Sequence, residues 1–574
     1  MAHLHKKIKK GRPYYYIREI ARVGGKPKVV NQVYLGSLER IIKMAQKDRE
    51  PAVKLQVQEF GGLWLANLID REIDFASIVD SIVPKGKNET GPTVGEYFLY
   101  AAFNRMVDTC AKRAFPQWFK DSAVNQIRPV DPDALTSQRF WDKWDRVDQA
   151  AIEEIARLFF RKINQLGPQG QGCFLFDTTN YYTYMASENE SELAKRGKNK
   201  DGKDWLRQVG LALLVSRETG FPLYYREYNG NQHDSKLFGD VLLPIVSNLS
   251  NLIGPGAEVT VVVDKGMNAE GNMEVIDQTD HLHFITTYST YFSPELMAID
   301  LKQFKPLEIS DHKALRDTGN SREPRLAFRT TGEYWHRERT VVVTYNPRTA
   351  RKQMYHFERK LFGLRRELYA IQAKMRDQLP QWRSPKAIEK RYAGLCEKRY
   401  MPNTFYDLSF ERLSRGWQMS FRKNPKTFAE YISRFGKNII ITDQHGCSTE
   451  EIVKASLDRW MVERSFRQSK DRDLIGALPI RHWTDGKIRC HFLSCIVALT
   501  YLRMIEQKLK EAGLNLTAAA AINRMRQLHS CLCWINGKRK PARIIEQPSQ
   551  IQAQILKAFK YKINPSGVLQ PLGS

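Results

Sequence analysis

The sequence predicts a multidomain α+β protein built around a mixed α/β sheet. Its 574 residues correspond to about three or four domains at roughly 150 residues each. With 42% apolar and 11% aromatic residues, the chain can form buried cores and is not disordered throughout. A helical periodicity covers residues 62–165, and a dense series of strand patterns begins at residue 173. The order of these patterns favours a sheet covered by helices.

The N-terminal region predicts a basic arm followed by helices. Strand patterns at residues 14–18 and 29–35 flank a turn at residues 24–26, which predicts a β-hairpin. Within the helical region, residues 135–144 mix basic and aromatic side chains after a Thr-Ser capping signal. This segment is a candidate DNA-recognition helix. The alternative is a helix that packs on the next domain.

The central strands carry two aspartates where a strand is expected to end. Residues 173–176 form a buried strand pattern that stops at Asp177, and the β-branched run at residues 259–263 stops at Asp264. Between them, residues 209–215 and 221–228 flank a turn and predict a hairpin. The sheet is therefore expected to be mixed, with antiparallel strands first and helix–strand alternation after them.

The sheet pattern is interrupted between residues 291 and 437. A strand pair at residues 326–330 and 339–345 leads into a long basic helix. The apolar residues of this helix repeat at alternating intervals of four and three, a near-heptad pattern. We expect a helical hairpin within the chain; a dimer seam is the alternative. The seam residues are Phe357, Leu361, Leu364, Leu368, Ile371 and Met375.

The positive charge is regional. The chain has 90 Lys and Arg against 63 Asp and Glu, a net charge of +27. Residues 1–60 carry +9, residues 351–430 carry +11 and residues 501–574 carry +9, so the remainder is nearly neutral. Such a distribution favours a protein that contacts a polyanion at several places. In the arm, the candidate DNA contacts are Lys6, Lys7, Lys9, Lys10 and Arg12.

The cysteines and the apolar runs indicate an intracellular protein. Eight cysteines are scattered without disulfide or zinc spacing, which favours free thiols in a reducing compartment. No uninterrupted apolar run approaches the roughly 20 residues that span a bilayer. The basic N-terminus lacks the apolar core of a signal peptide. We expect a cytoplasmic protein that contacts no membrane.

A third group of polar residues follows the last predicted strand. Arg459, Glu463 and Lys470 fall at helical offsets of 0, 4 and 11, which place them at about 0°, 40° and 20° around one helix. On its own, a solvated Arg–Glu ion pair would explain this helix. A strand-end carboxylate, however, is costly unless it is hydrogen-bonded or bound to a cation. Together with Asp177 and Asp264, this helix predicts a catalytic cluster.

The arrangement resembles one branch of bacterial insertion-sequence transposases with an Asp-Asp-Glu (DDE) triad and a ribonuclease H-like core. That branch carries the pattern Tyr-x2-Arg-x3-Glu-x6-Lys, which this chain matches at Arg459, Glu463 and Lys470. It departs at the tyrosine position, where Ser456 stands. The segments around Asp177 and Asp264 are also similar. The resemblance implies a ribonuclease H-like core interrupted by a large insertion.

The resemblance also implies a reaction. Asp177, Asp264 and Glu463 would hold two Mg²⁺ ions, with Mn²⁺ as a substitute, for hydrolysis of a phosphodiester bond. Arg459, Lys470 and Ser456 would contact DNA phosphates near the cut end. Trp335 would stack on a flipped base; a packed strand aromatic is the alternative.

The expected protein is a nucleoid-associated bacterial transposase. It would bind double-stranded DNA at the terminal inverted repeats of its element, cut both ends as a homodimer and join the 3′-hydroxyls to target DNA. Two alternatives remain: a structure-specific metal-dependent nuclease, and a catalytically inactive DNA-binding derivative.

The domain boundaries expected from these patterns divide the chain into six parts. They are a basic β-hairpin arm (1–60), a helical DNA-binding region (61–165), a first core part (166–290), an insertion domain (291–437), a second core part (438–510) and a basic C-terminal region (511–574).

Overall fold

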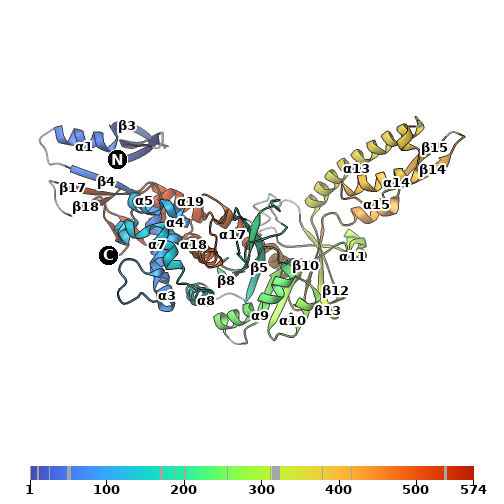
Figure 1. Ribbon diagram of the computed structural model, residues 1–574, viewed down its shortest axis with the longest axis horizontal. Helices are drawn as coiled ribbons and strands as arrows, with labels where there is room; N and C mark the ends of the chain where they lie inside the picture. Colours follow the sequence, from blue (N-terminus) through green and yellow to red (C-terminus); the bar gives the residue numbers. More distant parts are fainter. Residues whose placement is uncertain are drawn as a thin grey trace.

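The protein is an elongated mixed α+β molecule with several layers. In a computed structural model, Figure 1 shows a helical body with both chain ends at one side, a sheet at the centre and a helical arm at the other side. The structure describes residues 2–9, 12–24, 26–47, 53–167, 172–186, 188–198, 202–254, 256–309, 312, 324–377, 379–414, 416–535 and 540–573.

Both chain ends contribute to one region of the molecule. The N-terminal strands form a three-stranded antiparallel sheet in the order β1-β2-β3, one strand more than the expected hairpin. The next strand, β4, pairs antiparallel with β17, which also pairs with β18. Two basic segments that are distant in sequence therefore share a sheet. The elements are β1 (Ala2–Lys9), β2 (Arg12–Val23), β3 (Lys26–Gly36), α1 (Leu38–Lys47), β4 (Val53–Glu59), β17 (His529–Ile535), β18 (Ala542–Ile545), α20 (Gln550–Ala558), β19 (Tyr561–Ile563) and β20 (Leu569–Pro571).

Helices before and after the sheet form one body with a shared apolar core. Helix α4 begins with a capping box between Thr93 and Glu96, and it packs against α18. By length and composition α18 could cross a membrane, but 94% of its apolar window is buried inside the fold. The elements are α2 (Gly61–Ile73), α3 (Phe75–Ile82), α4 (Val94–Val107), α5 (Phe115–Asp121), α6 (Val124–Ile127), α7 (Ser137–Trp144), α8 (Gln149–Leu166), α18 (Asp485–Glu511) and α19 (Ala518–Met525).

The candidate recognition helix is α7, whose N-cap is Thr136, with the side-chain hydroxyl accepting a hydrogen bond from the Arg139 amide. Its Phe140 and Trp144 are buried, and Lys112 lies with its ammonium 4.7 Å and 5.1 Å from their ring centroids. Helix α7 contacts both α4 and α18. One face of α7 therefore packs against neighbouring helices. This agrees with the alternative to a recognition helix, a helix that packs on the next domain.

Among the residues that the structure describes, the central sheet has ten strands. Its first part runs in the order β8-β7-β5-β9-β10, in which β8, β7 and β5 are antiparallel neighbours and β9 and β10 are parallel to β5. Strand β16 then pairs antiparallel with β10. The elements are β5 (Cys173–Thr183), β6 (Lys195–Arg196), β7 (Arg207–Ser216), β8 (Pro222–Asn229), α9 (Asp234–Ile253), β9 (Val259–Val263), α10 (Glu270–Asp277), β10 (Leu282–Tyr288), β16 (Lys437–Thr442), α16 (Thr449–Asp458) and α17 (Trp460–Lys470).

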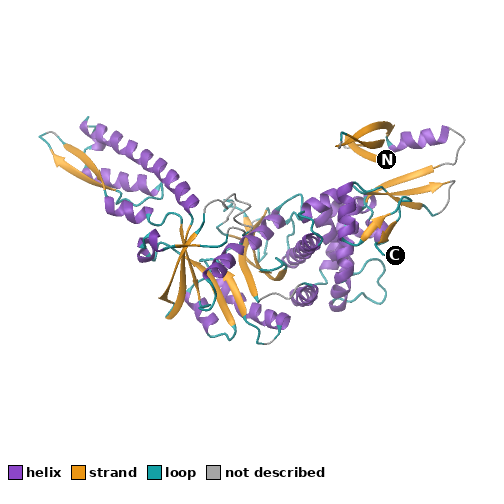
Figure 2. Ribbon diagram, turned by 180° about the vertical axis from the view of Figure 1, so that it is seen from behind, coloured by secondary structure: helices purple, strands orange, loops and turns teal. Residues whose placement is uncertain are grey.

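The sheet continues into the interrupting segment. Strand β13 pairs antiparallel with β16, and β12 and β11 follow it at the edge. The segment between β13 and β16 extends away from the sheet in Figures 1 and 2. We call this segment, which differs from the basic N-terminal arm, the helical arm. The elements are α11 (Pro294–Ala298), β11 (Lys305–Pro306), β12 (Leu326–Tyr334), β13 (Arg337–Tyr345), α13 (Pro347–Arg376), α14 (Pro385–Glu397), β14 (Tyr406–Arg412), β15 (Trp417–Lys423) and α15 (Pro425–Ile432).

The near-heptad seam of α13 packs within the arm. Of its six residues, five are buried and Leu361 is half-buried, in two clusters that also contain side chains of α14, β14 and β15. The helical-hairpin expectation therefore describes this structure, since the seam contacts its own chain. The domain boundaries stay predictions.

Candidate active site

Asp264 lies directly after β9 and accepts hydrogen bonds from two side chains. Its Oδ1 is 3.1 Å from Nη1 of Arg459 and 3.1 Å from the hydroxyl of Thr287, which both donate to it. The Asp264 side chain is 44% exposed, so it remains open to solvent on one side. Thr287 is in β10, the neighbouring strand, and it was not among the residues predicted from the sequence.

The surroundings of Asp264 favour its ionised form. Burial acts to raise the pKa of this carboxyl, but the positive charge of Arg459 acts against it, as do hydrogen bonds from the Lys265 backbone and Thr287. The net effect lowers the pKa of Asp264. The carboxylate is therefore charged at neutral pH, as a cation ligand must be.

Asp177 lies within β5 and not where that strand ends. Strand β5 continues past it to Thr183, because β7 pairs with β5 along its whole length while β9 pairs only with its first part. The expectation of a strand end at Asp177 is therefore wrong. Cys173 pairs with Thr260 and Leu175 with Val262, each 87 residues further on. Continuing this register by two positions places Asp264 next to Asp177.

Helix α17 lies against the strand that carries Asp177. The hydroxyl of Tyr181, four residues after Asp177 on the same side of β5, is 2.5 Å from the hydroxyl of Ser469, and both groups are buried. The ammonium of Lys470 is 5.3 Å from the Tyr181 ring centroid. Helix α17 also carries Glu463, which is exposed. Contacts with β5 therefore fix the position of the helix that holds the third carboxylate.

The expected single helix for Arg459, Glu463 and Lys470 is wrong in one detail. Helices α16 and α17 meet at Arg459, which is the C-cap of one and the N-cap of the other. Arg459 keeps near-helical angles, with φ −51° and ψ −22°, and its carbonyl accepts a 3.3 Å bond from the Glu463 amide. Because the turn between them stays helical, Arg459 and Glu463 still lie one turn apart.

The donor chemistry at this place suits a hard divalent cation. Asp177, Asp264 and Glu463 offer only oxygen, which Mg²⁺ and Mn²⁺ prefer. Among the described residues, no three His, Cys, Asp or Glu side chains stand close enough to hold one metal ion. In this arrangement Arg459 supplies the positive charge next to Asp264. The residue types fit a divalent metal, and the three carboxylates do not converge.

Comparison with known proteins decides the family. Residues 169–500 match a family model described as "Transposase DDE domain", which spans more than half of the chain. The chain belongs to the DDE transposase family. A solved structure described as a piggyBac transposase synaptic complex with hairpin DNA is similar at 9% identity and a TM-score of 0.38, covering 81% of this chain and 79% of that one. No curated protein matches the sequence.

Ser456 and the basic N-terminal residues, which the sequence predicts as DNA contacts, lie on different elements. Ser456 is half-buried in α16, one turn before Arg459. The basic residues of the N-terminal arm lie on β1 and at the start of β2. Lys7, Lys9 and Arg12 are exposed, and Lys6 is half-buried. Lys10 lies outside the described residues. Lys9 and Arg12 are opposite each other in the β1–β2 ladder.

Trp335 lies in the turn between β12 and β13. It has a φ of 50°, and His336 has a φ of 60°, so both central residues of the turn adopt a left-handed conformation that is uncommon for large side chains. The Trp335 ring packs edge-on against Phe284 at 5.8 Å and Tyr288 at 5.9 Å. This is the packed-aromatic alternative, and a role in base flipping stays a prediction.

Ion pairs that the sequence did not reveal hold the helix junction in place. Nε of Arg217, in the turn after β7, donates to Asp458 Oδ2 at 2.7 Å, and its Nη1 donates to Glu451. Asp458 Oδ1 also lies 2.8 Å from Nε2 of His312. Asp458 directly precedes Arg459, so these bonds fix the residue next to the Asp264 partner. The long sequence separations of these partners leave no local pattern that would predict them.

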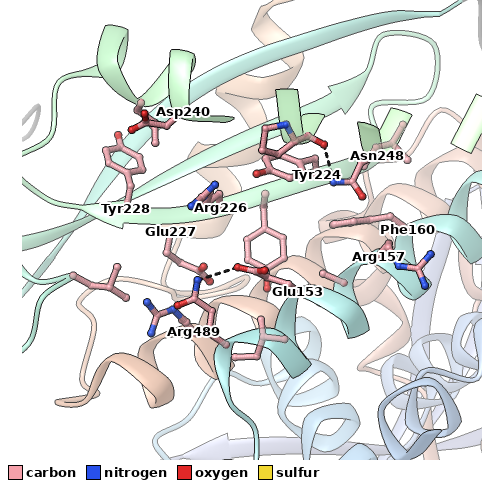
Figure 3. Close-up of a pocket in the computed structure, with 18 of the residues that line it drawn as sticks. Glu153, Arg157, Phe160, Tyr224, Arg226, Glu227, Tyr228, Asp240, Asn248 and Arg489 are labelled. Carbon is pink, nitrogen blue, oxygen red and sulfur yellow. Dashed lines mark hydrogen bonds between the residues drawn. The ribbon is translucent and has the colours of Figure 1, made fainter. Parts of the chain in front are cut away.

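A cavity of 420 Å³ lies between α8, β8 and α9, and neither Asp177 nor Asp264 lines it. Figure 3 shows Glu227 of β8 on the side of Glu153 and Arg489, and Tyr224 on the other side of the strand, near Asn248 of α9. Burial raises the pKa of Glu227 to about 7, and its Oε1 has no hydrogen-bond partner among the described residues. The cavity therefore contains a carboxyl whose charge depends on pH near neutrality.

Proposed function

We propose that this transposase cuts the ends of an insertion sequence and joins the freed 3′-hydroxyls to target DNA. Asp177, Asp264 and Glu463 are its proposed catalytic carboxylates. The observation that supports the proposal is the β5–β9 register, which would bring Asp177 and Asp264 side by side if it is continued by two residues. Helix α17, which bears Glu463, packs on the same strand as Asp177. The family match supports the reaction class.

The strand order supports a ribonuclease H-like core. An antiparallel meander of β8, β7 and β5, followed by β9 and β10 parallel to β5, agrees with the architecture that the sequence resemblance implies. In this proposal, the interrupting segment at residues 291–437 is the insertion of the Tyr-Arg-Glu-Lys branch. The departure at Ser456 leaves that branch a proposal.

The proposed cofactor is a pair of Mg²⁺ ions. When bound by Asp177, Asp264 and Glu463, the metal ions would supply a nucleophilic oxygen at neutral pH and charge stabilisation for the departing oxygen. Arg459 holds Asp264 in the ionised form in which it can act as a ligand. Lys470 lies at the other end of α17, with its ammonium 5.3 Å from the Tyr181 ring centroid, and in this proposal it would contact a DNA phosphate.

The proposed partners are the terminal inverted repeats and a target duplex. A net charge of +27, concentrated outside the central body, supports a DNA partner. Cutting two ends in one complex would require a homodimer. We also propose a cytoplasmic, nucleoid-associated location in a bacterium, which follows from the resemblance.

The test uses a supercoiled plasmid that carries the coding sequence with several hundred flanking base pairs on each side. This donor, a target plasmid and Mg²⁺ are incubated with the purified protein, and the cut ends and joined products are sequenced. We expect paired cuts at matched inverted repeats and insertion of the freed ends. Asp264→Ala and Glu463→Ala should remove both activities.

Two results would replace this proposal with an alternative. Cuts without any joined product would favour a structure-specific nuclease. DNA binding without Mg²⁺-dependent cutting would favour a catalytically inactive DNA-binding derivative. Cutting and joining by Asp264→Ala at the wild-type rate would show that the site assignment is wrong.

A further inference from the structure

The outer face of α13 carries a stripe of aromatic and arginine side chains. We name Tyr355, Arg359, Phe362, Arg366 and Tyr369 the outer stripe. Their spacing of four, three, four and three residues keeps them within an arc of about 80° around the helix. Tyr355 is 58% exposed, Phe362 70% and Tyr369 51%, and both arginines are exposed as well. The stripe is therefore a continuous solvent-facing surface.

The outer stripe lies largely outside the packing of the arm, although the Tyr369 ring packs edge-on against Phe421 of β15 at 5.0 Å. The apolar seam of α13 lies on the opposite side, where Phe357, Leu364 and Leu368 are buried against other elements of the arm. Helix α13 thus has a complete packing face and a second face that exposes three large rings. Three exposed aromatic residues at heptad spacing form a row that points to a binding partner.

The charge on α13 favours a polyanion over a second copy of the chain. The helix carries nine lysine or arginine residues and two glutamates, a net charge of +7. Two such helices brought together would place like charges along their whole contact, which opposes pairing. A phosphate backbone, in contrast, would be attracted along the full length of the helix.

We propose that the outer stripe binds the backbone of duplex DNA, as an addition to the DNA contacts already assigned. Arg359 and Arg366 would each bind a phosphate through the guanidinium group. The hydroxyls of Tyr355 and Tyr369 would donate to phosphates, and Phe362 would contact a sugar. The stripe is about 20 Å long, since 14 residues rise about 1.5 Å each, and this length matches about six base pairs.

Contacts between side chains of α13 restrict the rotamers of the outer stripe before a ligand binds. The guanidinium of Arg359 lies 5.9 Å from the Tyr355 ring centroid, and Nη2 of Arg365 donates to the Tyr369 hydroxyl at 3.4 Å. Such contacts restrict side-chain rotamers before binding and so reduce the entropy lost on binding. The arm also stands away from the body in both views, which leaves room for a duplex (Figures 1 and 2).

The test measures how DNA affinity depends on salt. The full-length Asp264→Ala protein, which binds without cutting, is titrated against a 60 bp duplex by fluorescence anisotropy at several salt concentrations. Arg359→Ala/Arg366→Ala should lower the slope of log K against log[salt] by about 2, because each lost phosphate contact removes about 0.9. Tyr355→Ala/Phe362→Ala/Tyr369→Ala should weaken binding by a similar factor at every salt concentration.

A matched control separates the stripe from overall charge. Lys386→Ala/Lys390→Ala removes two exposed charges from α14, next to α13, and should leave the slope within about 0.5 of the parent. An equal loss of slope in this control would contradict the proposal. So would an unchanged slope in the double arginine variant. Loss of a dimer by the aromatic variant, with unchanged DNA binding, would instead assign the stripe to self-association.

This inference rests on the proposed function, and the two can fail separately. If the parent protein binds no duplex at all, the DNA-transposase proposal fails. If the parent protein binds and the wild-type protein cuts DNA, but the arginine variant binds like the parent, only the outer stripe is refuted. Because none of the substituted residues is in a buried seam, circular dichroism should show the same fold in each variant.

Discussion

At the scale of single residues, Arg459 is the charged partner that favours the ionised form of Asp264. Its guanidinium, the Thr287 hydroxyl and the neighbouring backbone keep the carboxylate ionised at an accessible position. The spacing of Arg459 and Glu463 was visible in the sequence, but the contact between Arg459 and Asp264 joins residues 195 positions apart. Only the fold could reveal it.

Replacing Asp264 should separate activity from stability. We expect Asp264→Asn to reduce Mg²⁺-dependent DNA cutting by about a thousandfold or more, because a metal ligand is lost. Since the Arg459 ion pair is partly exposed, the free energy of unfolding should change by less than about 1 kcal/mol. Glu270→Gln, at an exposed carboxylate outside the site, is the control for activity. A variant that cuts DNA normally, or fails to fold, would contradict this assignment.

Glu227 should make stability depend on pH. Burial raises its pKa from 4.5 to about 7, so the folded protein binds this proton more tightly than the unfolded chain. The folded state therefore loses stability as pH rises from 4.5 to 7 and then stays level. Glu227→Gln removes this loss and should gain about 3 kcal/mol over wild type above pH 7.5, with a much smaller gain near pH 5.

Chemical denaturation of both proteins between pH 5 and pH 8.5 measures this difference. A difference between Glu227→Gln and wild type that is constant across the pH range would show that Glu227 does not titrate in this way.

At the scale of elements, the packing of α17 on β5 positions the helix that carries Glu463. The sequence predicted both elements, since an apolar strand and the helical spacing of Arg459, Glu463 and Lys470 are local patterns. It did not predict that β5 runs past Asp177, because β7 and β9 pair with different lengths of it. Nor did it predict that β12 and β13 extend the central sheet, because their alternation does not identify the neighbour with which they pair.

The hydrogen bond between Tyr181 and Ser469 should matter for cutting more than for binding. Tyr181→Phe removes it at a cost of about 1 kcal/mol in unfolding free energy. Because α17 then loses a fixed contact with β5, we expect slower Mg²⁺-dependent cutting at unchanged DNA affinity. Tyr182→Phe, whose side chain lies on the other face of β5, serves as the control. Lost affinity, or an unchanged cutting rate, would argue against a positioning role for Tyr181.

At the scale of the whole molecule, the charge is divided between two distant regions. The first 60 residues and the last 74 carry +9 each and meet through the sheet of β4, β17 and β18. The third basic stretch is the arm, at the opposite side of Figure 1. The nearly neutral centre carries Asp177, Asp264 and Glu463. Composition alone predicted the segments, while the meeting of both chain ends follows from strand pairing.

The two regions should contribute independently to DNA binding. Lys7→Ala/Lys9→Ala in β1 and Arg359→Ala/Arg366→Ala in α13 should each lower the salt slope, and the combined variant should show the sum within experimental error. Additivity is expected because the substituted residues lie far apart (Figure 1). A combined slope equal to that of one variant alone would contradict this picture and indicate that only one region contacts DNA.

The central claim is that Asp177, Asp264 and Glu463, which do not converge in this structure, form one metal site when DNA and Mg²⁺ are bound. Its most direct test replaces Mg²⁺ by Fe²⁺ in the DNA-bound protein and maps where hydroxyl radicals generated at the iron cut the polypeptide. The account predicts cuts next to all three residues in wild type, suppressed together by Asp264→Asn and unchanged in Glu270→Gln. Cuts near only one of the three, or at another place such as His529 and Cys531, would contradict a shared site.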